Sequence, residues 1–203
     1  NHHSIRGYCY CVWNVGDSMS KLQVETISHT NNTTGMTINS SGVISEPTRP
    51  CFHVSKSADQ SISDATLTLV TFDEITDGGN SKRQINVGGG YASNKFTVTA
   101  QTTGIYFFYS SLHFNCTDTI QDAYVYWRKN GSDVIQLVQS TGGPASSGVQ
   151  TGTFFNPCLI NLDTAGDYIE LMIYADISSG GTMNLNQNSV TSPRTQMGAY
   201  KVA

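Results

Sequence analysis

Alternating apolar and polar positions dominate the chain from residue 51 onward. The alternation predicts β-strands at residues 51–56, 64–75, 81–93, 95–100, 104–115, 122–131, 132–141, 152–162, 167–176, 182–187 and 196–203. Turn signals rich in glycine, asparagine and serine separate these runs, and none of the runs has the period of an amphipathic helix. Many short strands with such turns between them predict an all-β sandwich, jelly roll or closed barrel.

Three of the predicted strands are apolar on both faces. In residues 104–115 the two alternating sets are Tyr106, Phe108, Leu112 and Phe114 on one face and Ile105, Phe107, Tyr109 and His113 on the other. Residues 122–131 set Tyr124 and Tyr126 against Val125 and Trp127, and residues 167–176 set Tyr168, Met172 and Tyr174 against Ile169, Leu171 and Ile173. Antiparallel strands of a monomeric sandwich normally leave one face in water.

The two-sided strands indicate that the outer face of a sheet is covered. No helix is predicted that could cover it, so another copy of the same sheet is the simplest cover. Aromatic side chains suit such an interface. We therefore expect a homo-oligomer with Phe107, Tyr109, Tyr126 and Tyr174 as interface residues. The alternative is a closed barrel whose outward aromatic side chains are scattered and solvated.

Length, composition and charge narrow the range of functions. The chain has 203 residues, of which 38% are hydrophobic and 13% charged, which suits one domain with an accessory segment. Its net charge is −4, with 11 lysines and arginines and no basic run, so nucleic acid is not expected as a partner. Every apolar run is too short to span a bilayer, so membrane insertion is not expected either.

The first 50 residues differ in character from the rest. We interpret residues 1–18, which are rich in tyrosine, cysteine and histidine, as an extension upstream of a natural start at Met19. Residues 19–50 alternate weakly and end in EPTRP, which predicts a short β-rich arm followed by an extended linker. So short an arm cannot bury a core alone and is expected to pack on a partner or on copies of itself. Residues 51–203 then form the head.

Several motifs of the head resemble, in the same order, the globular head of complement component one-q and its tumour-necrosis-factor-like relatives. The motifs are CFHVSK at residues 51–56, VTFDEI at 70–75, KFTVTAQTTGIYFF at 95–108, WRKNG at 127–131, LINLDTAGDYIEL at 159–171 and MGAYKV at 197–202. The residues that carry the resemblance are Phe72, Phe96, Gly104, Tyr106, Phe108, Gly131, Gly166, Asp167 and Gly198. Physically, Asn130–Gly131 suits a tight hairpin and Gly166–Asp167 suits a turn.

This resemblance implies a ten-stranded jelly-roll sandwich that associates as a compact homotrimer. The chain departs from complement-type members in having no collagen-like Gly-x-y stem before the head. The arm, with LQVETI at residues 22–27 and TTGMTINSSGVI at 33–44, resembles N-terminal segments of structural proteins from marine tailed phages. That second resemblance implies a virion protein docked through its arm.

Candidate chemistry is sparse. No spacing joins a nucleophile to a base, so the protein is not expected to be an enzyme, and His53 and His113 are interpreted as packed or interface residues. Asp73 and Asp77 offer oxygen ligands that could hold calcium, although solvated turns are the preferred interpretation. No other cofactor is expected.

The five cysteines predict little chemistry of their own. Cys51, Cys116 and Cys158 lie singly in apolar stretches and are interpreted as small buried hydrophobes, with disulfides as the alternative. Cys9 and Cys11 form a lone C-x-C pair, which is too few ligands for a zinc site by itself.

A non-enzymatic head on an arm is expected to act by contact. Loops are the expected contact surfaces because they vary while the sandwich holds them, and the candidates are Lys129, Asn130, Asp133, Ser146 and Ser147. The favoured function is a virion appendage or fibre tip that binds a host-surface glycan or protein. The alternatives are a capsid decoration protein and a secreted recognition module of complement or lectin type.

Overall fold

The structure is a computed structural model that describes residues 25–28, 34–46, 48–73, 85–88, 90–116, 118–140, 151–185 and 195–203. The chain divides into two units, residues 1–48 and 49–203, which we call the arm and the head. The sequence predicted this boundary after residue 50. Arg49 and Pro50 belong with the head because Arg49 Nη2 donates to the Val202 carbonyl at 2.9 Å and Lys201 N donates to the Pro50 carbonyl at 3.1 Å. The predicted extension at residues 1–18 lies outside the described residues.

The arm contains a small antiparallel sheet of β1 (Thr26–Ser28), β2 (Thr34–Ile38) and β3 (Ile44–Ser45). Asn39 closes the turn between β2 and β3, since its Oδ1 accepts hydrogen bonds from the amides of Ser41 and Val43 at 2.9 Å each. Ile27, Val43 and Ile44 are more than half exposed, and none of the described arm residues is buried. The described part of the arm therefore has no core of its own.

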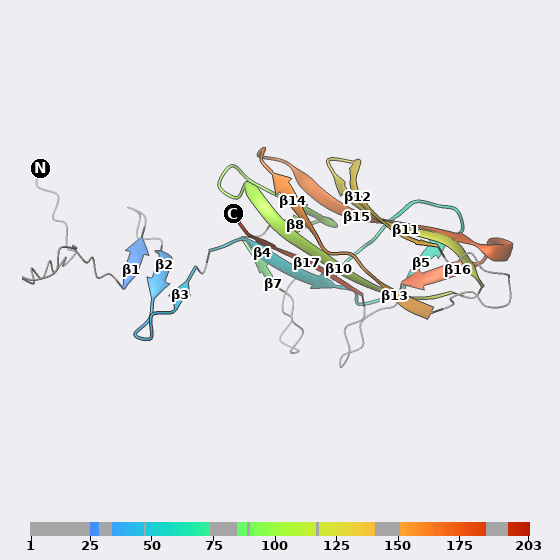
Figure 1. Ribbon diagram of the computed structural model, residues 1–203, viewed down its shortest axis with the longest axis horizontal. Helices are drawn as coiled ribbons and strands as arrows, with labels where there is room; N and C mark the ends of the chain where they lie inside the picture. Colours follow the sequence, from blue (N-terminus) through green and yellow to red (C-terminus); the bar gives the residue numbers. More distant parts are fainter. Residues whose placement is uncertain are drawn as a thin grey trace, which may run out of the picture. The chain divides into compact units, whose positions relative to one another are not determined.

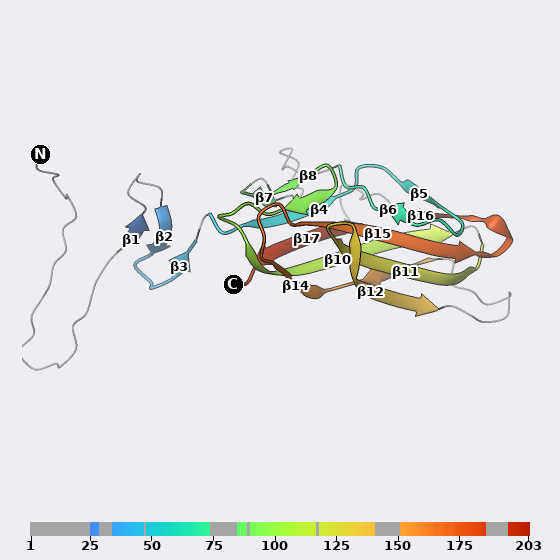
Figure 2. The same cartoon turned by 90° about the horizontal axis from the view of Figure 1, so that it is seen from above.

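The head packs two antiparallel sheets face to face (Figures 1 and 2). Its strands are β4 (Cys51–Ser55), β5 (Gln60–Ser63), β6 (Thr68–Leu69), β7 (Ile85–Val87), β8 (Tyr91–Ala92), β9 (Lys95–Thr97), β10 (Gly104–Cys116), β11 (Ile120–Lys129), β12 (Ser132–Ser140), β13 (Thr151–Phe155), β14 (Cys158–Leu162), β15 (Tyr168–Ile177), β16 (Thr182–Leu185) and β17 (Gln196–Lys201), with a short 3-10 turn at Ser178–Gly180. In the first sheet, here the β10 sheet, β16 and β17 pair with successive parts of one edge of β10, and β13 and β14 pair with the opposite edge. β5 lies beyond β16, while β4 and then β7 lie beyond β17. The second, here the β15 sheet, has the order β12-β11-β15-β9-β8, with β6 beside β15.

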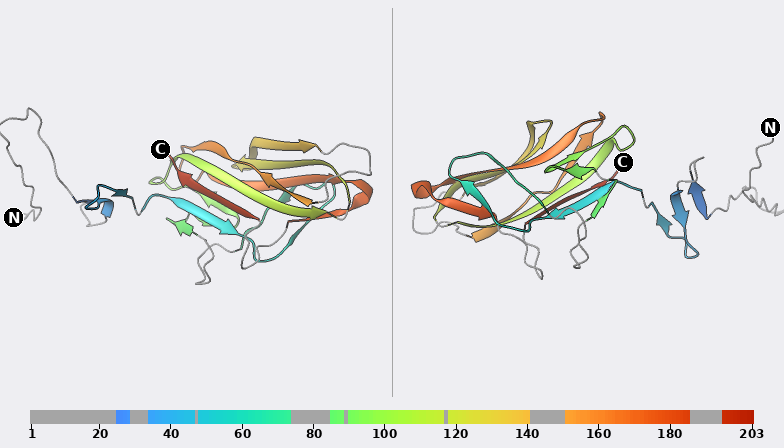
Figure 3. Two further views of the ribbon diagram at one scale, coloured as in Figure 1. Left: turned by 60° about the horizontal axis from the view of Figure 1, so that its bottom comes forward. Right: turned by 180° about the vertical axis from the view of Figure 1, so that it is seen from behind.

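The chain passes between the sheets in the order of a jelly roll. The last strand, β17, lies between β10 and the first head strand, β4, so both ends of the head meet in one sheet (Figure 3). After β10 the chain forms the β11–β12 hairpin of the other sheet, returns for β13 and β14, and crosses again to β15. The predicted all-β class is confirmed, and the head is a two-sheet sandwich rather than a closed barrel.

The described head has eight strand segments in one sheet and six in the other, where the resemblance implied ten strands in all. Interrupted edges account for part of the difference. Strands β13 and β14 pair with successive parts of β10 and are separated by Asn156 and Pro157. Proline divides this edge because it has no amide hydrogen to donate to the ladder.

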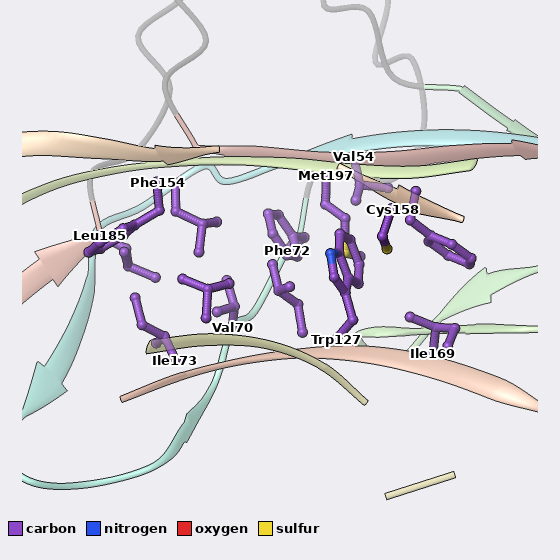
Figure 4. Packing of buried hydrophobic residues seen from close by; sticks show 14 of the residues in the cluster. Val54, Val70, Phe72, Trp127, Phe154, Cys158, Ile169, Ile173, Leu185 and Met197 are labelled. Carbon is purple, nitrogen blue, oxygen red and sulfur yellow. The ribbon is translucent and has the colours of Figure 1, made fainter. Parts of the chain in front are cut away.

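The core lies between the two sheets (Figure 4). The inward sets of the three two-sided strands are all buried, namely Tyr106, Phe108, Leu112, Phe114, Val125, Trp127, Ile169, Leu171 and Ile173. Trp127 Nε1 donates to the Asn156 carbonyl at 3.0 Å, which satisfies the one polar atom of this large side chain. The predicted division of each strand into an inward and an outward set is therefore confirmed. Phe72 and Phe96 are buried in the same core.

Two of the head's glycines, Gly104 and Gly131, occupy positions with positive φ, which side chains disfavour. Gly104 begins β10 with a φ of 147°, and a Cβ there would overlap the Ala203 carbonyl oxygen and lie 2.6 Å from Lys201 Cε. The predicted hairpin at Asn130–Gly131 is present, with φ values of 53° and 79° at these two residues. The hairpin predicted at Asn130–Gly131 is therefore confirmed.

No disulfide joins any two of the described cysteines. Cys116 and Cys158 are buried, and burial raises the pKa of Cys158 to about 12, so it behaves as a small hydrophobe. Cys51 is partly buried. Cys9 and Cys11 lie outside the described residues.

Candidate functional site

Large apolar side chains cover the outer face of the β10 sheet. The strand register places Leu159 beside Phe107 and Phe107 beside Tyr200, on β14, β10 and β17 respectively. The rings of Phe107 and Tyr200 are 5.4 Å apart. We call this surface the β10 face and define it by Phe107, Tyr109, Phe155, Leu159 and Tyr200.

The β10 face is exposed and uncharged in the isolated chain. Leu159, Phe155 and Tyr200 are 60%, 59% and 49% exposed. None of the outward positions of the described strands β4, β10, β14 and β17 carries an Asp, Glu, Lys or Arg. Contiguous exposed apolar surface marks interaction sites, and depletion of charge is typical of the centre of an interface.

One hydrogen bond organises the centre of this face. Tyr109 on β10 lies opposite Gly198 on β17, which in turn lies opposite His53 on β4. Because Gly198 has no side chain, the Tyr109 ring crosses β17 and its hydroxyl lies 2.8 Å from His53 Nδ1. A Cβ on Gly198 would lie 2.5 Å from Tyr109 Cζ. Partial burial, with smaller contributions from Cys51 and Tyr200, raises the pKa of Tyr109, so its hydroxyl keeps its proton near neutral pH.

The four predicted interface residues do not share one surface. Phe107 and Tyr109 lie on the β10 face, whereas Tyr126 and Tyr174 lie on the outer face of the β15 sheet with Tyr124 between them. The Tyr124 ring is 6.1 Å from that of Tyr126 and 5.7 Å from that of Tyr174. The sequence period identifies the faces of a strand but not the sheet that the strand joins.

The predicted contact residues at the β11–β12 hairpin are engaged within the head. Lys129 Nζ lies 2.9 Å from Asp167 Oδ2 and 3.3 Å from Asp163 Oδ1. Asn130 Nδ2 donates to Asp167 Oδ1 at 2.8 Å, and Asn130 Oδ1 accepts from the Tyr168 amide at 3.0 Å. The bonds from Lys129 and Asn130 hold the pKa of Asp167 at about 2. This network joins the hairpin to the turn before β15.

The remaining predicted site residues are dispersed. Asp133 forms an ion pair with Arg128 Nε at 2.8 Å, and Ser146 and Ser147 lie outside the described residues. Asp73, the first calcium candidate, accepts a hydrogen bond from the Ser57 amide at 2.7 Å and another from the Ser57 hydroxyl, while Asp77 lies outside the described residues. Across the described chain, no three His, Cys, Asp or Glu side chains are placed to hold a metal ion.

A hydrogen bond to a side chain of another strand positions each of the two strand histidines. His113 Nδ1 lies 3.1 Å from Thr153 Oγ1, and His53 contacts Tyr109 as described above.

In the ranges that the structure describes, no helix is both long and apolar enough to cross a bilayer.

Sequence reasoning did not select Phe155, Leu159 or Tyr200 for the candidate interface. Phe155 and Leu159 belong to residues 152–162, where the buried apolar residues are Phe154, Cys158, Ile160 and Leu162. The same two-sided pattern that identified β10 was therefore present in this stretch and could have identified both. Tyr200 stands alone between Ala199 and Lys201, so only the strand pairing assigns it to the face.

No known protein family and no curated protein matches this sequence. Among solved structures, the chain is similar to murine APRIL at pH 5.0, with a TM-score of 0.47 and 19% identity over 76% of this chain and 99% of that chain. The same protein at pH 8.5 gives a TM-score of 0.46 with the same identity and coverage. Eiger TNF from S. frugiperda gives a TM-score of 0.46 and 14% identity over 76% of this chain and 94% of that chain. Similarity at this level assigns neither family nor function to the chain.

Proposed function

We propose that the head is a non-enzymatic homotrimeric contact module in which the β10 face is buried between copies of the chain. The observation that carries the proposal is the contiguous, uncharged surface formed by the half-buried Phe107 and the exposed Leu159 and Tyr200. Removing such apolar surface from water favours association of the chains. The trimeric stoichiometry rests on the resemblance of the head motifs to complement-type heads.

Light scattering of the full chain tests this assembly. We expect about three times the 22.0 kDa chain mass at micromolar concentration. Leu159→Glu places a charge in the β10 face and should produce monomers. The matched control is Val134→Glu, because Val134 is 46% exposed on β12 of the other sheet and should leave the mass unchanged. A monomeric wild-type chain, or equal effects of the two variants, would contradict the proposal.

We propose further that the trimer is a virion appendage or fibre tip that binds a host-surface glycan or protein, with the arm docked to the particle. The resemblance of residues 22–27 and 33–44 to phage structural proteins supports this role, and so does the exposure of Ile27, Val43 and Ile44 on an arm sheet without a core. The purified chain should then bind host cells and compete with the intact particle during infection. Tight binding to the capsid lattice without host binding would favour decoration, and ligand binding without incorporation into particles would favour a secreted recognition module.

The arm can be tested separately from the head. Val43→Asp combined with Ile44→Asp should prevent incorporation into particles, because it charges the exposed apolar positions of the arm. Ser40→Asp, which adds a charge at an exposed polar position of the same turn, is the control. Normal incorporation of the double variant would overturn docking through the arm.

A further inference from the structure

A second aromatic surface lies on the outer face of the β15 sheet. Tyr124 and Tyr126 come from β11 and Tyr174 from β15, and Tyr124 lies directly opposite Tyr174 in the strand register. All three side chains are half-buried. Three phenol rings thus present π-surface on this face.

Two carboxylates stand next to these rings on the same face. Asp122 lies directly opposite Asp176, in the row of the sheet beyond Tyr124 and Tyr174. Like charges placed opposite each other on neighbouring strands destabilise a sheet. We call Asp122, Tyr124, Tyr126, Tyr174 and Asp176 the acidic tyrosine face.

Other carboxylates of this sheet have cationic partners. Asp133 pairs with Arg128, and Glu170 lies 3.7 Å from Lys95 Nζ. No Lys, Arg or His of the described residues forms an ion pair with Asp122 or Asp176. The negative charge at this end of the face is therefore left uncompensated within the described chain.

The pKa of Tyr174 reflects the same excess of negative charge. Partial desolvation raises the pKa of Tyr174 first, and the carboxylates of Asp176, Asp64 and Asp122 raise it further. A negative potential therefore surrounds the ring edge, which favours an approaching cation and disfavours an anion.

We propose that the acidic tyrosine face binds an arginine-containing basic segment of a partner protein. A guanidinium placed between Asp122 and Asp176 neutralises both carboxylates, while its plane stacks on the Tyr124 or Tyr174 ring. The face is a sheet surface, which suits an extended segment lying along it. This inference deepens the proposed contact role of the head by naming the chemistry of one partner, and it assigns Tyr126 and Tyr174 to that contact instead of the assembly interface.

A labelled hexa-arginine peptide titrated into the full chain, with fluorescence anisotropy as the readout, tests the proposal. Saturable binding is expected, and Asp122→Asn combined with Asp176→Asn should weaken it about tenfold at low salt. Asp59→Asn combined with Asp163→Asn removes the same charge elsewhere on the head and should change binding less than about twofold. No saturable binding, or equal weakening by both double variants, would overturn the proposal.

Variants of Tyr124 test how much the aromatic rings contribute to peptide affinity. Tyr124→Leu keeps an apolar side chain but removes the π-surface, and should weaken hexa-arginine binding about threefold. Tyr124→Phe retains the ring and should bind like the wild type. Unchanged binding by Tyr124→Leu, or binding of an uncharged oligosaccharide that survives the aspartate changes, would contradict a cation site.

This test is independent of assembly. Leu159→Glu should retain the peptide affinity of each chain, because Leu159 lies on the β10 sheet and the peptide site on the β15 sheet. If the wild-type chain proves monomeric and still binds the peptide through Asp122 and Asp176, the assembly proposal fails and the cation site stands. If the wild-type chain is a trimer but does not bind the peptide, the cation site fails and the assembly proposal stands.

Discussion

The Tyr109 hydroxyl lies 2.8 Å from His53 Nδ1, on the far side of a strand that has no side chain at the crossing point. Gly198 provides that space, and the Tyr109 and His53 rings are stacked with centroids 5.9 Å apart. The contact ties β10 to β4 over β17 in the middle of the face that we propose is buried between copies. We therefore expect the space above Gly198 to contribute more to the stability of the head than the hydrogen bond between Tyr109 and His53.

The first prediction compares these two contributions. Gly198→Ala should destabilise the head by about 1–3 kcal/mol, because the new Cβ would overlap the Tyr109 ring and lie 2.8 Å from the Phe52 carbonyl oxygen. Tyr109→Phe keeps the ring and loses one hydrogen bond, and should cost about 1 kcal/mol. Chemical denaturation measures both free energies of unfolding. A larger loss for Tyr109→Phe would show that the hydrogen bond dominates.

The second prediction concerns Gly104. Gly104→Ala should destabilise by about 2–4 kcal/mol, since it combines a backbone conformation unsuited to side chains with a clash against the C-terminal residues. Gly180→Ala is the control, because Gly180 has a φ of 68° but nothing within 4 Å of an added Cβ. It should cost about 1 kcal/mol, the backbone component alone. Thermal or denaturant unfolding showing similar losses for the two would mean that the clash at Gly104 is relieved cheaply.

The third prediction is a dependence of stability on pH. The folded pKa of Asp167 is about 2, below the ordinary value of 3.8, so its carboxylate stabilises the folded state above about pH 4. That stabilisation is lost as the pH falls from about 4 to about 2. Asp167→Asn should therefore be less stable than the wild type at pH 7, and the two should converge near pH 2. A difference that stays constant over this range would contradict the assigned Lys129 and Asn130 bonds.

The fourth prediction follows from the opposed carboxylates. Asp176→Asn should stabilise the free protein by about 0.2–1 kcal/mol at low salt, because it removes the repulsion from Asp122. In a chain that already carries Asp122→Asn, the same change should have little further effect. Thermal unfolding at low and high salt measures this coupling, which should shrink as salt increases. An unchanged or lowered melting temperature at low salt would show that another group compensates the pair.

Local features were well predicted from the sequence for a clear physical reason. Alternation in residues 104–115 separated buried Phe108 from outward Phe107, because successive side chains of any strand point to opposite faces. The Asn130–Gly131 hairpin was predicted because few residues tolerate positive φ at both central turn positions. These are properties of a few neighbouring residues, so they can be read before the fold is known.

The contact residues at the hairpin show where local reading ends. Lys129 and Asn130 look like an exposed loop tip in the sequence, yet both bond to Asp167 in the turn before β15. The bonds that a side chain makes to a distant segment depend on where that segment folds. Sequence patterns alone could not predict these bonds, and a contact role for Lys129 and Asn130 stays a prediction.

By itself, the sequence determined the all-β class, the two side-chain sets of each two-sided strand and the hairpin at Asn130–Gly131. Only the tertiary structure decided that Phe107 and Tyr126 belong to different sheets, and that Leu159 and Tyr200 flank Phe107 while Asp122 faces Asp176. The reason is that the period of a strand is set by its own backbone, whereas its neighbours are set by hydrogen bonds between segments far apart in the chain. The composition of each outer face, and with it the kind of partner it can bind, depends on that pairing.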